Sequence, residues 1–398
     1  MPKTKGQWIR LAIQVFFLAL VTVLALLHQN SGGGPTGFAA IDAFCPFGSL
    51  EGIYQYLANQ TFIQRLYLSN FVILGALIAL TIVLYRYFCS WICALGTLQD
   101  LAHRLGSLLW KHKVTIPARI DRIMRWFKYG VLAFVLYMTW TTATLFIRPY
   151  DPFAAYLHIS SGWTELWDGF SVGLIILVVS LIASIFVERF FCKYLCPLGA
   201  FLEMLRRLSP FKIHRDQATC TDCKLCDRKC PMNIKVSTAT EVKSKECINC
   251  LECVSVCPTR KETLTPKVGA WKLTVLKVGM LGLAIYLGVI GIAYVAGAWQ
   301  TKQNDLKKVV EINGELDPAG IKGYMTQNDI SSTFDLPLAD LYRELGFTES
   351  KISPKTQIKS IGAELGVSED EFSPEIVREV VTMLLEPSTV VPSETLGK

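Results

Sequence analysis

The chain has 398 residues, 51% of them hydrophobic, and its mean hydropathy of +0.36 is high for a soluble protein. This composition argues against an ordinary soluble protein and predicts insertion into a membrane. The formal charge of +7 averages a basic membrane part with residues 302–398, where seventeen acidic residues outnumber ten basic ones. Basic residues beside apolar segments suit anionic lipid headgroups, so membrane lipid is expected as a partner and nucleic acid is not.

Five apolar segments are long enough, or nearly so, to cross a hydrocarbon core of about 30 Å as helices. They are Leu11 to Leu27, Leu66 to Tyr85, Tyr129 to Ile147, Phe170 to Val187 and Val278 to Trp299. The first also has the basic flank of a signal peptide, but its apolar core is long and no small-residue cleavage site follows promptly. We therefore expect an α-helical multi-pass membrane protein with about five spans.

Positive charge is distributed unevenly among the loops between these spans. Residues 86–127 hold seven Lys or Arg against two acids, residues 29–68 hold one against two, and residues 148–168 hold one against three. Because cytoplasmic loops carry the excess of Lys and Arg, the amino terminus, the 86–127 loop and residues 188–277 are predicted to be cytoplasmic. After the fifth span, residues 302–398 are then extracytoplasmic. The expected location is a bacterial cytoplasmic membrane.

Eight of the thirteen cysteines fall in a 38-residue stretch and read C-x2-C-x2-C-x3-C-P twice. This is the spacing of bacterial two-cluster ferredoxins, in which three thiolates bind one 4Fe-4S cube and the fourth thiolate reaches the other. The expected ligand sets are Cys220, Cys223, Cys226 and Cys257 for one cluster, and Cys247, Cys250, Cys253 and Cys230 for the other. Zinc is the alternative, but zinc ribbons do not need a third and a fourth cysteine at these offsets.

A second pattern repeats within the membrane part, where residues 88–108 align without a gap on residues 191–211 at an offset of 103. The identical pairs include Phe88 with Phe191, Cys89 with Cys192, Cys93 with Cys196, Gly96 with Gly199 and, just upstream, Arg86 with Arg189. Each unit consists of two spans joined by a Pro-Phe outer loop, then a CxxxC and a short amphipathic helix. Two units of the same orientation predict a two-fold internal repeat about an axis along the membrane normal.

The repeat predicts that Cys89, Cys93, Cys192 and Cys196 gather on the cytoplasmic side. Cysteines at i and i+4 of one helix have Cβ atoms about 5 to 6 Å apart, which is too far for a disulfide within that helix. Thiol chemistry between the repeats, a four-thiolate metal or cluster site, and plain packing remain open. We expect a redox or metal role, because paired cysteines in register beside a redox domain are not typical of packing. Cys45, on the outer side, stays open between function and packing.

These features divide the chain into six parts. They are a first membrane repeat (1–109), a second (110–210), a ferredoxin-like domain with two 4Fe-4S clusters (211–268), a fifth span (269–301), an acidic helical domain (302–386) and a disordered tail (387–398). In the acidic domain, Thr326 is placed to cap a helix over Gln327 to Phe334, and Pro337 to Leu345 predicts another. An acidic helix pair outside the cell is expected to bind a protein and not DNA.

With both cysteine patterns, the sequence resembles the NapH/NosR-type family of polyferredoxin membrane proteins over about residues 8–265. The family motif is CxxxCP, which Cys192 to Pro197 fits fully, whereas the first unit has Ala94 in place of proline. The resemblance implies a quinol dehydrogenase-like subunit of a respiratory chain that takes electrons from the membrane quinone pool. The acceptor would be an extracytoplasmic or cytoplasmic redox partner. A redox sensor, or a factor that reduces or assembles a metal cofactor, is the alternative.

Overall fold

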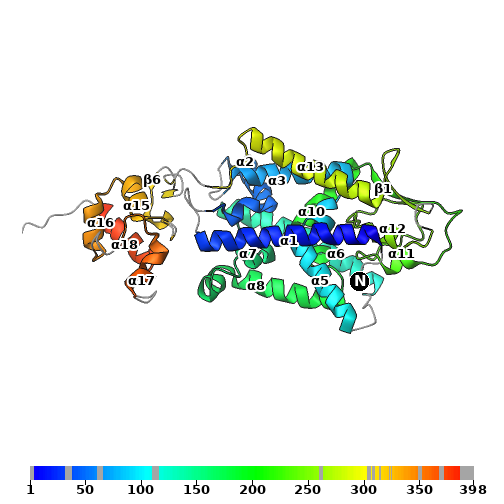
Figure 1. Cartoon of the computed structure of the whole chain (residues 1–398), viewed down its shortest axis with the longest axis horizontal. Helices are drawn as coiled ribbons and strands as arrows, with labels where there is room; N and C mark the ends of the chain where they lie inside the picture. The colour runs from blue at the N-terminus through cyan, green and yellow to red at the C-terminus, as the bar shows by residue number, and fades with distance from the viewer. Residues whose placement is uncertain are drawn as a thin grey trace, which may run out of the picture. The chain divides into compact units, whose positions relative to one another are not determined.

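The computed structural model forms two compact units, residues 1–30 with 41–301 and residues 31–40 with 302–398, which are described separately (Figure 1). The structure describes residues 4–31, 38–60, 66–109, 116–259, 263–302, 306, 310–312, 315–321, 323, 325–347, 352–366 and 372–385. The predicted disordered tail, 387–398, lies outside these residues.

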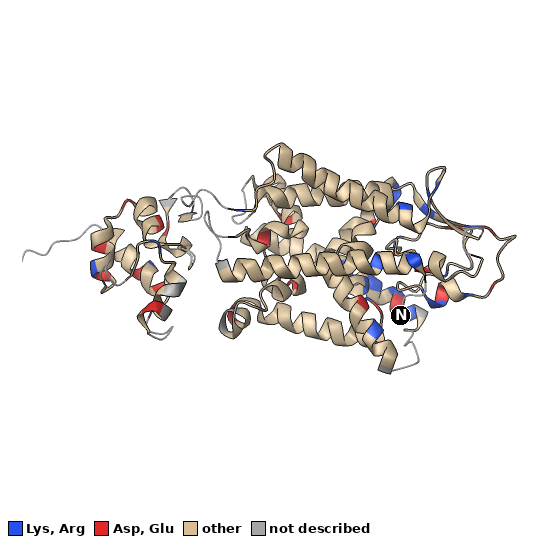
Figure 2. Ribbon diagram, in the orientation of Figure 1, with Lys and Arg blue, Asp and Glu red and all other residues tan. Residues whose placement is uncertain are grey.

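Among the described residues of the first unit, three helices are long and apolar enough to cross a membrane: Lys5–Asn30 of α1 (Lys5–Ser31), Leu166–Phe186 of α8 (Trp163–Phe186), and α13 (Val275–Val295). All three leave large apolar side chains uncovered, among them Phe16, Ile175 and Ile292, as expected of helix faces that contact lipid. In Figure 2, Lys and Arg of this unit gather mainly toward the end with the ferredoxin strands, and the long helices are largely free of charge. The prediction of a helical membrane protein is confirmed at this level.

The other two predicted spans differ from the expectation. The 66–85 segment forms α3 (Leu68–Leu84), which is apolar but only 17 residues long. The 129–147 segment belongs to α6 (Ala118–Thr142), which begins eleven residues earlier and ends five residues sooner than predicted. Its first turns carry charged side chains that pair with other parts of the unit, for example Lys128 with Glu203, so the helix extends beyond its apolar part. The count of five spans stays a prediction.

The internal repeat is visible in the helix boundaries. In the first half α3 is followed by α4 (Tyr87–Trp91) and α5 (Ala94–Leu109), and in the second half α8 is followed by α9 (Phe190–Tyr194) and α10 (Pro197–Met204). Helices α4 and α9 begin and end at positions 103 residues apart, and α5 and α10 begin at the same offset. The Pro-Phe loops form α2 (Pro46–Asn59) and α7 (Pro152–Leu157), each with proline at its first position, where the missing N–H is not needed.

The ferredoxin region adds a four-stranded antiparallel sheet in the order β2-β1-β3-β4. Its strands are β1 (Phe211–Arg215), β2 (Glu241–Val242), β3 (Leu264–Val268) and β4 (Trp271–Lys272), and two short helices, α11 (Leu225–Arg228) and α12 (Glu252–Val256), follow cysteine loops. Trp91 Nε1 donates to the Asn249 carbonyl at 2.9 Å, and Asn249 Nδ2 donates to the Leu84 carbonyl at 2.7 Å. The domain is thereby joined to the inner end of the first repeat.

The second unit is a small helical domain with its own apolar core. Its elements are β5 (Glu311–Ile312), β6 (Glu315–Leu316), α15 (Gln327–Phe334), α16 (Leu338–Glu344), α17 (Ile358–Leu365) and α18 (Pro374–Leu385). Thr326 caps α15 together with Asp329, which confirms the predicted helix start. Leu341 of α16 is fully buried in this core.

Candidate metal centres

Two cavities in the ferredoxin domain are each lined by four cysteines drawn from both sequence runs. Cys220, Cys223, Cys226 and Cys257 line a first cavity of about 360 Å³. Cys230, Cys247, Cys250 and Cys253 line a second cavity of about 340 Å³. Each cavity thus contains the cysteines of one predicted ligand set, with the fourth thiol contributed by the other run. Among the described residues, no three His, Cys, Asp or Glu side chains converge on a point that a single metal ion would occupy.

The two cysteine loops owe their shape to the same unusual backbone. Asp222 and Lys224 in the first loop have φ of 48° and 55°, and Asn249 and Leu251 in the second have φ of 54° and 58°. Left-handed residues on either side of a cysteine turn the chain sharply, and such a backbone is costly for side chains other than glycine. The three x2-spaced thiols of each loop are thereby wrapped around one cavity.

The surroundings of the two cavities differ. At the first, Cys223 is exposed, and the buried Arg215 donates through Nη2 to Cys220 Sγ at 3.2 Å. At the second, Cys230 and Cys253 are both buried. The backbone N–H of Ile234 donates to Cys230 Sγ at 3.3 Å. N–H groups that donate to sulfur stabilise thiolates. Because more of its cysteines are buried, the second cavity is less accessible to water than the first.

The four CxxxC cysteines, here called the thiol cluster, lie where the helices of the two repeats break. Cys89 and Cys192 lie within α4 and α9, whereas Cys93 precedes α5 and Cys196 is the N-cap of α10. The expectation that each pair occupies one continuous helix is therefore wrong, because α4 ends at Trp91 and α9 at Tyr194. The thiol of Cys196 interacts electrostatically with those of Cys192, Cys89 and Cys93, so the repeat brings all four into one region.

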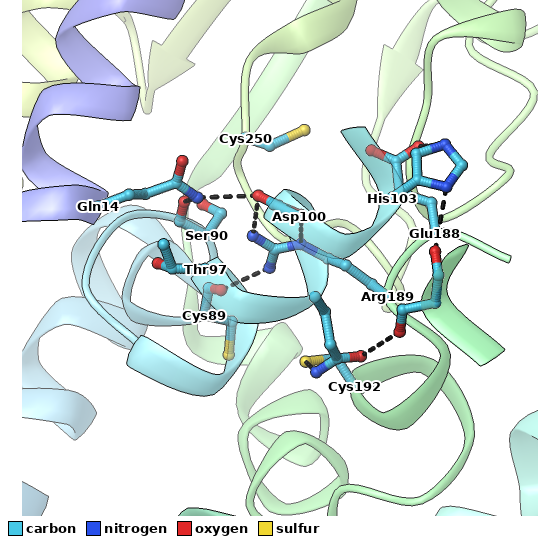
Figure 3. A network of polar contacts seen from close by, with 12 residues as sticks. Gln14, Cys89, Ser90, Thr97, Asp100, His103, Glu188, Arg189, Cys192 and Cys250 are labelled. Carbon is cyan, nitrogen blue, oxygen red and sulfur yellow. Dashed lines mark hydrogen bonds and ion pairs between the residues drawn. The ribbon is translucent and has the colours of Figure 1, made fainter. Parts of the chain in front are cut away.

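Buried ion pairs connect the two repeats around the thiol cluster, as Figure 3 shows for one side. Arg189 of the second repeat contacts Asp100 of the first at 2.6 Å, and Arg86 of the first repeat pairs with Glu203 of the second. All four side chains are at most 5% exposed. Sequence reasoning missed these pairs, although the signal was present: Asp100 and Glu203 lie 103 residues apart, at the offset that also relates the two arginines.

A second cation completes each of these pairs. Arg10 Nη2 contacts Asp100 at 2.9 Å, and Lys128 Nζ contacts Glu203 at 2.6 Å. Each buried carboxylate is therefore shared by two cations. Burying ions is costly unless their partners remain in place, so this network fixes the positions of the helix ends that carry the thiols.

The thiol cluster adjoins the second cysteine cavity. Cys89 packs against a buried group formed by Cys230, Met232 and Ile248, with Cys250 at its margin. On the other side, Cys93 and Cys196 pack in an apolar group with Leu95 and Phe191, which Tyr156 of α7 also joins. The thiols therefore lie between the outer-loop helices and the ferredoxin domain.

A third cavity, of about 460 Å³, lies where the two Pro-Phe loops meet, and this is where Cys45 is located. Its lining includes the N-cap residues of α2 and α7, Cys45 and Asp151, together with Glu51 and Arg148. Burial away from water raises the pKa of Glu51 to about 7 and that of Asp151 to about 6. Thr139 donates to Glu51 Oε1 at 2.7 Å, while Oε2 has no partner among the described residues.

Comparison with known proteins assigns the class. A family model described as a 4Fe-4S binding domain matches residues 66–113 and again residues 171–216, one match on each membrane repeat. A model described as a 4Fe-4S dicluster domain matches residues 212–258, the segment with both cysteine cavities. Together with the three apolar helices, these matches define an iron–sulfur, ferredoxin-type electron transport protein associated with a membrane.

Curated relatives narrow this class to a family. YccM of Escherichia coli is 30% identical over 319 residues, which are 73% of this chain and 86% of YccM. The ferredoxin-type protein NapH of E. coli is 29% identical over 192 residues, covering 46% of this chain and 62% of NapH. The regulatory protein NosR of Pseudomonas aeruginosa is 27% identical over 167 residues, covering 42% and 23%.

The chain belongs to the family of ferredoxin-type 4Fe-4S proteins that contains YccM, and its resemblance to NapH and NosR is confirmed. No solved structure matches the chain.

Proposed function

We propose that this protein oxidises membrane quinol and passes the electrons through two 4Fe-4S clusters to a partner redox protein. Oxidation of one quinol to the quinone releases a pair of electrons and a pair of protons. The electrons reduce an oxidised partner, one at a time, and the protons enter the aqueous phase. The observation that carries the proposal is the apolar core that extends without a break from the membrane helices α3 and α13 to Cys253 of the second cysteine cavity.

The eight ferredoxin cysteines would hold the clusters in crossed sets. The first cavity offers Cys220, Cys223, Cys226 and Cys257, and the second offers Cys247, Cys250, Cys253 and Cys230. Bound in this way, such clusters are one-electron carriers. The chain supplies the thiolates, the donors from Arg215 and the Ile234 amide, and the packing that keeps water from the second cavity.

The positions of the two cysteine cavities in the structure suggest the order in which their clusters act. The second cavity touches the thiol cluster and the first cavity is the more exposed, so the second receives electrons from the membrane side and the first delivers them. The exposed Cys223 marks the surface at which a soluble partner would come within electron-transfer distance. The loop charges support a cytoplasmic position for this surface.

The test uses the full chain, purified without oxygen in detergent or lipid. We expect about eight iron atoms with matching acid-labile sulfide, and EPR signals that develop when a quinol is added. Zinc in place of iron would refute the cluster assignment. Clusters that a chemical reductant reduces but quinol does not would refute the electron source and favour a sensor or assembly factor.

The crossed ligand sets are tested by Cys230→Ser. We expect this variant to lose the cluster whose other ligands are Cys247, Cys250 and Cys253, because the Cys230 thiol lines that cavity and not the one nearest to it in the sequence run. EPR and iron content measure the loss. Cys45→Ser, which removes a membrane-region thiol distant in sequence from both runs, is the matched control and should keep both signals. Loss of the other cluster in Cys230→Ser would refute the assignment.

A further inference from the structure

We propose that the thiol cluster, Cys89, Cys93, Cys192 and Cys196, holds a third iron–sulfur cluster at the interface of the two repeats. This inference rests on the proposed function, because the third cluster would lie between the membrane helices and the second ferredoxin cavity. Four observations carry it: the position of the thiols, the charge around them, a pair of glycines, and an unpartnered donor.

In both repeats the pair of thiols spans a break between two helices. Each repeat contributes one cysteine from a single-turn helix and one from the break that follows it, so neither pair is locked along a helix face. Gln99 of the first repeat donates through Nε2 to Cys192 Sγ of the second at 3.2 Å, and Gly199 N donates to Cys196 Sγ at 3.3 Å. Polar donors to sulfur are a feature of iron–sulfur sites, and of these two contacts the one from Gly199 also caps α10.

The charge nearest to the thiols is positive. Both Arg86 and Arg189 interact electrostatically with Cys192, and Arg189 Nη1 also donates to the Cys89 carbonyl at 2.5 Å. Around them, four cations that are at most 5% exposed share two equally buried carboxylates. The cations are Arg10, Arg86, Lys128 and Arg189, and the carboxylates are Asp100 and Glu203.

The remaining acids of this network, Glu246 and Glu252, belong to the ferredoxin domain and are 16% exposed. The innermost shell is therefore cationic. Four thiolates around an iron–sulfur core are a net anion, and the guanidinium groups of Arg86 and Arg189, although each also contacts a buried carboxylate, would stabilise it.

Two glycines related by the repeat let the guanidinium groups approach. A Cβ at Gly199 would lie 2.9 Å from Arg86 Nη2 and 3.6 Å from Cys196 Sγ. A Cβ at Gly96 would lie 2.8 Å from the Cys89 carbonyl and 3.3 Å from Arg189 Nη1. The same small residue thus occurs at both equivalent positions, each time between a cysteine of its own repeat and the arginine of the other.

Arg86 also has one side-chain N–H group without an acceptor. Its Nε is buried and has no acceptor among the residues that the structure describes, although its Nη1 is paired with Glu203. A buried N–H without a partner costs free energy, and an acceptor within its reach would remove this penalty. Cluster sulfide and thiolate are acceptors of this kind. The family model described as 4Fe-4S binding covers both CxxxC segments, which agrees with the proposal.

The decisive experiment counts iron and sulfide in the full chain, purified without oxygen, and compares it with a Cys89→Ser/Cys192→Ser double variant. We expect the wild-type protein to hold about two or four iron atoms more than the eight of the ferredoxin sites, for a two-iron or a four-iron cluster. The double variant should lose this excess and its EPR signal while the ferredoxin signals remain. Cys45→Ser should lose nothing.

Several outcomes would overturn the proposal. A wild-type iron content of about eight, unchanged in the double variant, would leave the four thiols as packing residues. Zinc at the site, or thiols found oxidised to disulfides on anaerobic alkylation, would replace the cluster with another chemistry. If the double variant does not fold, the excess iron and a third redox signal of the wild-type protein alone decide the question.

Further variants separate ligands from the groups around them. Each single Cys→Ser change in the thiol cluster should remove nearly all of the excess iron, so the double variant should add little to either single one. Arg86→Gln should keep the excess iron but lower the midpoint potential of the third signal, since a positive charge is removed beside it, and Arg86→Lys should restore it in part. Unchanged potentials would contradict a role for the arginine.

The proposal and the proposed function can fail separately. A third cluster that quinol does not reduce would leave this inference standing and refute the electron source. Quinol-dependent reduction of the two ferredoxin clusters, in a protein with no excess iron, would refute the third cluster and leave the function intact.

Discussion

At the scale of single residues, glycine at position 199 is a tightly packed neighbour of the thiol cluster. Gly199→Ala puts a Cβ 2.9 Å from Arg86 Nη2, so the guanidinium must move and its pairing with Glu203 weakens. We expect a loss of about 1 to 3 kcal/mol in the free energy of unfolding, measured as a lower thermal midpoint in detergent.

The matched control is Gly288→Ala in α13, where an added Cβ meets nothing within 4 Å. Alanine is the better helix former, so this variant should be as stable as the wild-type protein or slightly more stable. Equal losses in both variants would show that the space around Gly199 is not specifically required.

The sequence predicted the two sets of ferredoxin cysteines but not the buried ion pairs around the thiol cluster. The spacing of the eight ferredoxin cysteines was enough to sort them into the sets that line the two cavities, because the crossing is a property of a short local segment. Arg86 and Arg189 were recognised as equivalent, but their partners were not, since an ion pair such as Arg189 with Asp100 depends on how the repeats pack. A search for acids at the offset of 103 would have found both.

At the scale of elements, helix α2 places the buried carboxyl group of Glu51 at the third cavity, where the two Pro-Phe loops meet. Burial raises the pKa of Glu51 to about 7, from an ordinary value of 4.5. The folded state therefore binds this proton more tightly than the unfolded state, and the unfolding free energy falls as pH rises from about 4.5 to about 7. The shift sets an upper limit of about 3 kcal/mol on this loss.

Glu51→Gln removes the titration while keeping an oxygen that can accept from Thr139. We expect its thermal midpoint to equal that of the wild-type protein near pH 4.5 and to exceed it at pH 8. Asp168→Asn, which changes an exposed carboxylate on α8, should show no such pH-dependent gain. A Glu51→Gln variant with the same pH profile as the wild-type protein would contradict the buried, neutral state.

The long apolar helices α1, α8 and α13 could be predicted because hydropathy and length alone identify them. The breaks before α4 and α9 could not, since Tyr85 and Arg189 adopt a positive φ that nothing in their residue type favours. These turns are maintained by tertiary contacts, such as the pairing of Arg189 with Asp100. The helical start of α6 was missed for a related reason, because its charges are stabilised by partners from other segments.

At the scale of the whole molecule, we predict that the ferredoxin domain is cytoplasmic and that residues 302–398 are extracytoplasmic. This prediction rests on the loop charge bias and on an odd number of spans. The number is odd whether three or five helices cross. An epitope placed at Gly269, in the exposed β3–β4 turn, should bind antibody only after the membrane is permeabilised. A carboxy-terminal epitope should bind on intact spheroplasts, and equal access for both epitopes would mean an even number of spans.

The crosswise ion pairs have a consequence for how the two halves came to share a chain. Arg86 reaches the carboxylate of the second repeat, and Arg189 reaches the equivalent carboxylate of the first. In an isologous two-fold interface, each contact between the two copies occurs twice, once in each direction. The two arginine–carboxylate pairs follow this rule. At these contacts the two membrane repeats therefore meet as the subunits of a homodimer would. In isolation each half would leave its arginine, Arg86 or Arg189, without the carboxylate that it contacts, so changes at one position are constrained by the partner position in the other half.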